Sequence, residues 1–366
     1  MGTKKKDFVL CILFALLFAG GFLLCLLLPK DKYSESERRM LSPMPEFGAA
    51  GVWSGRFMSD FEAYAVDSFP FRNFLRSIKA VTALHIFCKQ DNNGIYVVED
   101  FLSAMEYPVD EASLKRAVGR FRYICEKYLT DENRVYLSVI PDKNCFLAKE
   151  SGYLSMDYAD FEYQMEEQAD FATYISISDL LERDDYYRTD THWRQEKIMD
   201  VAERLALSMG TTLLEDYEIH TLEQGFYGVY YGQAALPFAP DKLMYVTGED
   251  ICSCQVYDWQ NQREIPVYNI SDETTGKDPY EMFLSGSLSL ITIKNPYAQT
   301  DKKLVMFRDS FGSSIAPLLI SGYAQIDLVD IRYIHPDHLG QFIDFNHCDV
   351  LFLYSTLVLN NSDTIK

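Results

Sequence analysis

The chain has 366 residues, of which 48% are hydrophobic and 24% are charged, and its formal net charge is −20. A chain of this length and composition can form a large domain around a buried core. Phosphate binding needs a basic surface, so the acidity argues against nucleic acid as a partner.

The N-terminal segment has the composition of a membrane-spanning helix. Lysines 4–6 precede an uncharged apolar run from Phe8 to Leu28. About 20 such residues cross a hydrocarbon layer as a helix, and the preceding lysines predict a cytoplasmic N-terminus. Small residues at 19–21 leave a cleaved signal peptide open, but no clean cleavage site follows. We therefore expect an uncleaved signal anchor over residues 1–29. The protein would then be a single-pass protein of the cell membrane with its bulk outside the cytoplasm.

Residues 30–90 are expected to form a spacer followed by helices. The first part, residues 30–50, is polar and contains prolines, as is typical of a juxtamembrane spacer. Apolar residues then recur at helical spacing over residues 53–88. Pro70 lacks a backbone N–H, so we expect it to divide this stretch into two helices.

From residue 91 onward, strand patterns alternate with helical patterns. Strands are expected over residues 94–98, 134–140, 174–177, 304–307, 325–331 and 349–355. Helices are expected over residues 111–129, 157–171, 194–209 and 314–321. Residues 221–300, rich in Gly, Tyr and turn signals, are expected to form a strand- and loop-rich insertion. The alternation predicts an α/β domain with a mainly parallel sheet flanked by helices.

The first stretch with candidate chemistry runs from Arg308 to Ser314. A buried strand ends there, Ser310 lies on the turn, and a helix begins. The functional crevice of an open α/β sheet lies at this end of the strands. A serine on such a turn is exposed and has free backbone N–H groups nearby that can stabilise an oxyanion. Helix capping by Asp309 or Ser310 explains the same residues equally well.

The second stretch, residues 188–193, reads RTDTHW and precedes an amphipathic run. A serine hydroxyl is a poor nucleophile without a base. His192 can take its proton, and Asp190 can orient the imidazole and stabilise the imidazolium. The pair could also be a metal half-site, but no further His or Cys lies close in sequence. We expect the stretch to cap the following helix and to supply the base of a triad with Ser310.

Seven short motifs, taken in chain order, resemble those of a known family. They are SERRML (36–41), DSFPFR (67–72), NNGIYV (92–97), VIPDKN (139–144), RTDTHW (188–193), FRDSFGSS (307–314) and DIRY (330–333). Together they resemble the DHHW proteins, relatives of the alginate O-acetyltransferases in the SGNH hydrolase-like group. The resemblance covers nearly the whole chain after the anchor.

This resemblance implies an SGNH hydrolase-like catalytic domain over residues 91–366, circularly permuted so that Asp-x-His precedes the serine. It implies Ser310 as nucleophile, His192 as base and Asp190 as the partner of the base. Arg308 replaces the glycine of the usual Gly-Asp-Ser, and Thr191 stands where the family name has a histidine. A clear oxyanion glycine is missing, which leaves the Ser310 backbone N–H as the expected oxyanion donor.

The family further implies an extracytoplasmic O-acetyltransferase that acts on a cell-surface or secreted polysaccharide through an acyl-enzyme. A multipass membrane-bound O-acyltransferase would deliver the acetyl group, and no metal or organic cofactor is needed. Two alternatives stay open. The same triad would serve a polysaccharide acetyl esterase, in which water attacks the acyl-enzyme. A non-catalytic envelope protein that binds polysaccharide is the other alternative.

Six more residues are candidate substrate contacts. Lysine and arginine suit an anionic group, and aromatic rings suit the face of a sugar. Solvated charges and ordinary packing explain the same residue types. The candidates are Arg308, Lys143, Arg332, Tyr333, Tyr231 and Trp193.

Overall fold

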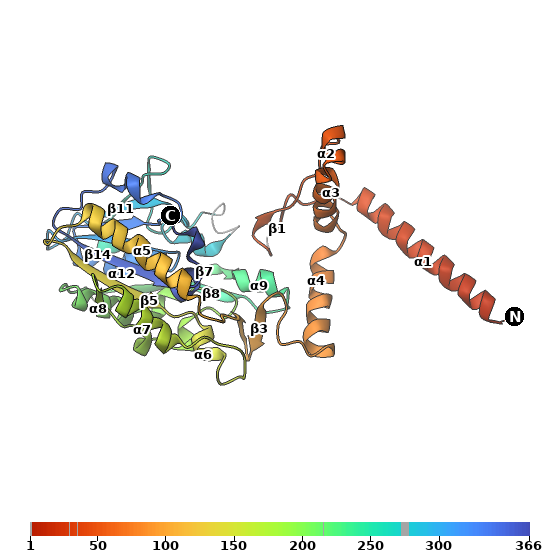
Figure 1. Ribbon diagram of the computed structural model, residues 1–366, viewed down its shortest axis with the longest axis horizontal. Coiled ribbons are helices and arrows are strands. Elements are labelled where there is room, and N and C mark those ends of the chain that lie inside the picture. The colour runs from red at the N-terminus through yellow and green to blue at the C-terminus, as the bar shows by residue number, and fades with distance from the viewer. Residues whose placement is uncertain (1, 29, 35, 215, 272–277) are drawn as a thin grey trace. The chain divides into compact units, whose positions relative to one another are not determined.

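The computed structural model describes residues 2–28, 30–34, 36–214, 216–271 and 278–366. The chain forms two compact units (Figure 1). The N-terminal unit contains residues 1–92 and 232–237, and the sheet unit contains residues 93–231 and 238–366.

The N-terminal unit begins with helix α1 (Gly2–Leu27). Its segment Lys5–Cys25 is long and apolar enough to cross a membrane. The apolar side chains from Phe8 to Leu24 are largely exposed, as they would be in contact with lipid. A helix of this kind fits a signal anchor and a signal peptide alike.

Short helices and a small hairpin complete this unit. Strands β1 (Tyr33–Ser34) and β2 (Arg39–Met40) pair antiparallel. The helices are α2 (Ala49–Trp53), α3 (Arg56–Asp67), α4 (Arg72–Val81) and the π-helical turn η1 (Thr82–Ile86). The predicted break at Pro70 is confirmed, because α3 ends before it and α4 begins after it.

Charged residues of the motifs SERRML and DSFPFR bind one another inside the N-terminal unit. Two nitrogens of Arg39 donate to the Asp67 carboxylate at 2.8 and 2.6 Å. The Ser42 N–H donates to the same carboxylate at 2.9 Å. These hydrogen bonds hold the pKa of Asp67 well below its usual value. Arg72 donates to Glu37 in the same network. Each motif therefore supplies one negatively charged and one positively charged side chain to this network.

The sheet unit contains an eight-stranded sheet in the order β10-β9-β11-β13-β12-β14-β5-β6. Its parallel strands are β13 (Gln325–Val329), β12 (Lys303–Arg308), β14 (Cys348–Ser355), β5 (Arg134–Ile140) and β6 (Thr173–Tyr174). Its antiparallel strands are β11 (Leu290–Lys294), β9 (Gln255–Asp258) and β10 (Arg263–Ile265). The predicted α/β class with a mainly parallel sheet is confirmed.

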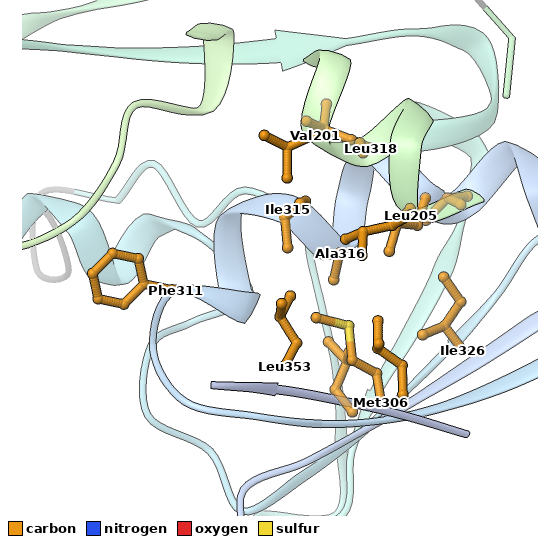
Figure 2. Close-up of a cluster of buried hydrophobic side chains, with 14 of the residues drawn as sticks. Val201, Leu205, Met306, Phe311, Ile315, Ala316, Leu318, Ile326 and Leu353 are labelled. Carbon is orange, nitrogen blue, oxygen red and sulfur yellow. The ribbon is translucent and has the colours of Figure 1, made fainter. Parts of the chain in front are cut away.

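Helices cover both faces of this sheet. One face packs against α5 (Glu111–Tyr128) and α7 (Tyr158–Gln168), and the other against α8 (Met199–Ser208) and α12 (Gly312–Leu319). Burying each large apolar side chain stabilises the fold by about 1.5–3 kcal/mol. Figure 2 shows part of the second layer, with Val201, Leu205, Ile315, Ala316 and Leu318 above Met306, Ile326 and Leu353.

Residues 221–300 contain the expected short strands, but some of these strands belong to the main sheet. Strands β7 (Glu218–Phe226) and β8 (Asp241–Thr247) form a separate hairpin, whereas β9, β10 and β11 extend the sheet. The strand predicted at 94–98 is β3 (Ile95–Val98), and it lies outside the main sheet. It forms a separate two-stranded sheet with β4 (Phe101–Ala104). Short strands carry little information about their partners, since pairing depends on residues far away in sequence.

The remaining helical segments are short and connect these elements. They are α6 (Asn144–Leu147), η2 (Ser178–Leu180), η3 (Arg183–Asp185), η4 (Gln195–Lys197), α9 (Val229–Ala234), α10 (Glu249–Ser253), η5 (Pro279–Met282), η6 (Ile320–Gly322), η7 (Pro336–Gln341), α13 (Thr356–Leu359) and η8 (Ser362–Thr364).

Candidate active site

Ser310 lies on the turn between β12 and α12, at the carboxyl edge of the parallel strands. The Asp309 carboxylate fixes this turn. It accepts hydrogen bonds from the Phe311 N–H at 3.0 Å and from the N–H and hydroxyl of Ser355 at 2.8 and 2.6 Å. Helix α12 has Phe311 at its N-cap and no side-chain cap bond. Asp309 therefore holds the turn that leads into α12 through the Phe311 N–H and also ties that turn to the end of β14.

The RTDTHW stretch forms a loop rather than a helix cap. The Tyr187 N–H donates to the His192 carbonyl at 3.1 Å, which closes the loop. Helix α8 begins only at Met199, and its N-cap, Ile198, makes no side-chain cap bond. The expected cap is wrong. The Asp190 carboxylate accepts the His192 N–H at 3.1 Å in a local turn instead.

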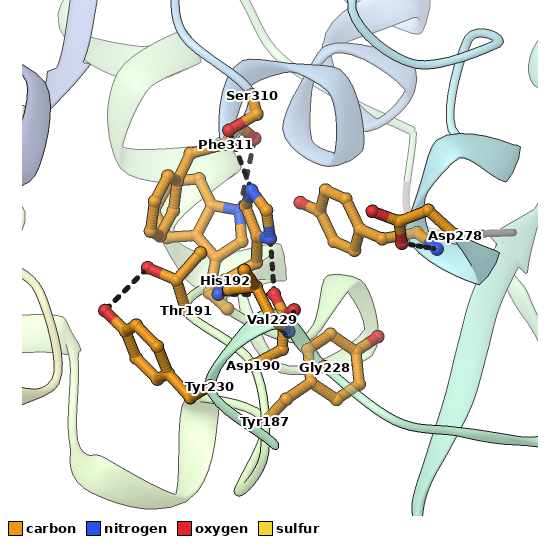
Figure 3. Close-up of polar contacts among 12 residues, drawn as sticks. Tyr187, Asp190, Thr191, His192, Gly228, Val229, Tyr230, Asp278, Ser310 and Phe311 are labelled. Carbon is orange, nitrogen blue, oxygen red and sulfur yellow. Dashed lines mark hydrogen bonds and ion pairs between the residues drawn. The ribbon is translucent and has the colours of Figure 1, made fainter. Parts of the chain in front are cut away.

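Asp190, His192 and Ser310 form one line of hydrogen bonds, shown in Figure 3. The His192 Nδ1 lies 2.5 Å from an Asp190 oxygen, and its Nε2 lies 2.7 Å from the Ser310 Oγ. Asp190 is fully buried, and the His192 side chain is 12% exposed. With the proton on Nδ1, the imidazole donates to the carboxylate and accepts from the serine hydroxyl. Such an arrangement can activate the hydroxyl as a nucleophile.

Backbone and side-chain bonds from distant segments hold Asp190 in place. The second oxygen of its carboxylate accepts the Val229 N–H at 2.7 Å. The Gly228 N–H donates to the Thr189 hydroxyl at 2.9 Å, and that hydroxyl donates to Asp241 at 2.6 Å. Sequence reasoning missed Asp241, which lies about 50 positions away from the loop and carries no motif.

Gly228 is expected to tolerate no side chain. A Cβ added there would overlap the Asp190 Cα and Cβ and the Thr189 carbonyl oxygen. Gly228→Ala should lower the free energy of unfolding by about 1–3 kcal/mol and displace Asp190, as checked by urea unfolding and ester cleavage. Gly119→Ala, in open space on α5, is the matched control. Equal stability and activity in the two variants would contradict this account of the loop.

Lys143 lies beneath the loop and does not face a substrate. Its ammonium group donates to the carbonyls of Tyr187, Arg188 and Asp190 at 2.7, 3.2 and 2.6 Å. The side chain is 1% exposed, and burial lowers its pKa to about 7. It was expected to contact an anionic group, but its three donors are used inside the protein.

Arg308 and Trp193 are also buried among protein groups. The Arg308 guanidinium is completely buried and donates to the Asp309 carbonyl at 3.3 Å. The Trp193 indole donates to the Phe311 carbonyl at 3.2 Å and to the Ser314 hydroxyl at 2.9 Å. Trp193 therefore links the loop that carries the histidine to the helix that follows the serine.

The other three candidate contacts keep some exposed surface. Arg332 is bound through two nitrogens to the Asp330 carboxylate, at 2.9 and 2.6 Å. Tyr333 is 50% exposed. Tyr231 is partly exposed, and its ring lies 4.5 Å from that of Tyr227. The two tyrosines are the candidates with an accessible ring face.

The site contains one aromatic residue that sequence reasoning missed. The ring of Tyr280, from η5, lies parallel to the His192 ring with 3.8 Å between centroids and 10° between planes. No spacing or motif connects two residues so far apart in the chain. The chain has 25 Tyr and 24 Phe, and this high content does not indicate which ring lies beside His192.

The Ser310 N–H has no hydrogen-bond partner among the residues that the structure describes. This donor remains available to an oxyanion formed at the serine. Within the same described ranges, no group of three or more His, Cys, Asp or Glu side chains could hold a metal ion.

The sheet order and the helices on its two faces define an α/β fold with a mainly parallel sheet. A DHHW family protein from Eubacterium siraeum shares it with a TM-score of 0.63 and 20% identity, over 75% of this chain and 95% of that one. Bacillus cereus PatB1 matches with a TM-score of 0.56 and 18% identity, over 74% of this chain and 98% of that one. The structure of PatB1 with a sulfonyl adduct matches with a TM-score of 0.54 and 18% identity, over 74% of this chain and 99% of that one. The predicted resemblance to DHHW proteins is thus confirmed for the fold. Neither a family model nor a curated protein sequence matches the chain.

Proposed function

We propose that this protein is an extracytoplasmic O-acetyltransferase that acts on a cell-surface or secreted polysaccharide. The observation that carries the proposal is the unbroken line of hydrogen bonds from Asp190 through His192 to Ser310. The fold shared with the DHHW family protein supports it. The chain's net charge of −20 favours a neutral acyl group over a phosphoryl group.

In the first half of the proposed reaction, the Ser310 Oγ attacks the acetyl carbonyl while His192 takes its proton. The negative charge on the carbonyl oxygen is stabilised by the Ser310 N–H, and Asp190 stabilises the imidazolium. When the tetrahedral intermediate collapses, His192 gives the proton to the leaving group, and acetyl-serine remains.

In the second half, a sugar hydroxyl attacks the acetyl-serine. His192 takes the proton of that hydroxyl as the new ester bond forms, and returns it to the Ser310 Oγ as the acyl–serine bond breaks. Water can follow the same route, which would give an esterase. The ring faces of Tyr231 and Tyr333 are the proposed sugar contacts.

The proposed setting is the outer face of the cell membrane. Residues 1–29 would anchor the chain, residues 30–90 would hold the domain near the bilayer, and residues 91–366 would carry the reaction. The apolar segment Lys5–Cys25 supports this arrangement. An acetyl group carried to this side would be delivered by a multipass membrane-bound O-acyltransferase.

The test uses the full-length chain in detergent with p-nitrophenyl acetate as donor. Intact mass should show one acetyl group on the wild type, and a neutral oligosaccharide acceptor should take it up. Ser310→Ala should lack the adduct, whereas Ser313→Ala, a nearby serine in α12, should keep it. Ester cleavage that survives Ser310→Ala would refute the triad. Release of acetyl to water alone, with every acceptor tried, would establish the esterase instead.

A further inference from the structure

The ring of Tyr280, in the segment before β11, stacks on the imidazole of His192 in the proposed triad. The centroid distance of 3.8 Å and the angle of 10° place the two rings face to face. Phe311 approaches the same imidazole at 4.9 Å and 53°. Figure 3 shows His192 with Phe311 to one side and Asp278, which precedes η5, to the other.

The hydroxyl of Tyr280 is anchored independently of the ring contact. It donates to the Ser314 Oγ at 2.9 Å, and the Trp193 indole donates to the same oxygen at 2.9 Å. Burial raises the pKa of Tyr280 well above its usual value, so the hydroxyl stays protonated and can donate. Ser314 lies on α12, directly after the nucleophile turn. The tyrosine is therefore held against the helix while its ring covers the histidine.

A ring face next to an imidazole acts differently on its two protonation states. The face of an aromatic ring carries partial negative charge, which attracts a cation at close range. The imidazole becomes a cation each time it takes a proton from Ser310 or from the acceptor. A stack of this geometry also restricts rotation of the imidazole about its Cβ–Cγ bond, so that Nε2 stays directed at the Ser310 Oγ.

We propose that Tyr280 is a positioning residue for His192. Its ring face holds the plane of the imidazole and stabilises the imidazolium that forms in each half of the reaction. The inference rests on the proposed function for its role in turnover, but its effect on the protonation of His192 can be measured without turnover.

The charged groups around this pair stay the same in the variants that test it. Asp190 lies on the histidine's own loop, Asp309 in the nucleophile turn and Asp278 at the start of η5. All three act on Tyr280 electrostatically. A change in the titration of His192 that follows a change at Tyr280 alone therefore reports the ring contact.

Two substitutions separate the ring from the hydroxyl. Tyr280→Leu keeps apolar volume beside His192 and removes the ring, while Tyr280→Phe keeps the ring and removes the bond to Ser314. Loss of the ring should lower the midpoint of the His192 titration by about 0.4–1.5 pH units. The rate of Ser310 acetylation should fall about two- to thirtyfold in Tyr280→Leu. In Tyr280→Phe the midpoint should stay within about 0.3 pH units of the wild type.

The midpoint is read from imidazole NMR of the full-length chain, with the His192 signal assigned by its loss in His192→Gln. Circular dichroism shows whether each variant folds, and Tyr280→Met replaces Tyr280→Leu if the leucine variant does not. An unchanged or raised midpoint in the folded ring-less variant overturns the proposal, as does an equal shift in Tyr280→Phe. A lowered midpoint in a chain whose Ser310 never becomes acetylated would uphold the ring contact and refute the acetyltransferase.

Discussion

Asp190→Asn is expected to lower kcat for acetyl transfer roughly 10³–10⁴-fold with little change in KM. The Asp190 carboxylate accepts from the His192 Nδ1 and from the Val229 N–H on separate oxygens. An asparagine can keep one acceptor only, because its NH₂ group must point at one of these two donors. If the oxygen stays with Val229, the NH₂ faces Nδ1 and drives the proton to Nε2. An imidazole protonated at Nε2 cannot take the proton of Ser310.

With its NH₂ group facing Nδ1, the asparagine also stops accepting from the His192 N–H. The bonds of Thr189 to Asp241 and of Lys143 to the loop carbonyls stay in place, so stability should change far less than activity. Thermal unfolding measured beside steady-state kinetics separates the two effects. Asp184→Asn, six positions earlier and with a 57% exposed side chain, is the matched control and should retain full activity. A loss of less than about tenfold in Asp190→Asn would show that the carboxylate does not orient the base.

Lys143→Met is expected to lower the free energy of unfolding by roughly 3 kcal/mol. Methionine matches the length of the lysine side chain but donates no hydrogen bond. The carbonyls of Tyr187, Arg188 and Asp190 would lose their shared donor in a buried place. Because these carbonyls belong to the loop that carries the triad, the rate of Ser310 acetylation should fall as well.

The same lysine predicts a pH dependence of stability. Its pKa is about 7 in the folded chain and lower than the ordinary lysine value of 10.5. Between these two values the unfolded chain binds more protons than the folded chain, so stability rises with pH across this window. The slope contributed by this group is at most about 1.4 kcal/mol per pH unit. Below pH 7 both states hold the proton, and the contribution to the slope vanishes.

Urea unfolding at pH 6, 7.5 and 9 checks both statements. The difference in unfolding free energy between wild type and Lys143→Met should grow from pH 7.5 to pH 9. Lys149→Met replaces an exposed lysine six positions further on and should leave both the stability and its pH dependence unchanged. If the difference in unfolding free energy between wild type and Lys143→Met does not change with pH, the lowered pKa of Lys143 is contradicted. If Lys143→Met loses no more stability than Lys149→Met, the anchoring role of Lys143 is contradicted.

The central strands were predictable because both faces of the sheet are buried. Runs such as LVMF at 304–307 and VLFLY at 350–354 are apolar without alternation, which is typical of a parallel sheet covered on both sides. They form β12 and β14, next to each other in the sheet. The position of Ser310 at the edge of the sheet was predictable because it follows one of these runs directly, where the parallel strands end.

The surroundings of the triad were not predictable, because they depend on contacts between distant segments. The sequence makes Lys143 a candidate contact for an anionic group, but the RTDTHW loop folds over it. Tyr280 and Asp241 lie in a region whose short strands gave no register. Nothing in the sequence therefore placed Tyr280 beside His192 or Asp241 beside Thr189. The assignment of Asp190 to a helix cap failed because a loop and the turn η4 separate it from α8.

The three tryptophans of the chain lie in three different environments. Trp193 is fully buried between the RTDTHW loop and α12, Trp259 is half-buried, and Trp53 is 95% exposed. Indole emission moves to longer wavelength in water, and soluble quenchers reach exposed rings first. The blue, quencher-resistant part of the fluorescence therefore belongs mainly to Trp193. Its intensity and wavelength report whether the RTDTHW loop is packed against α12, and the signal can be read without any substrate.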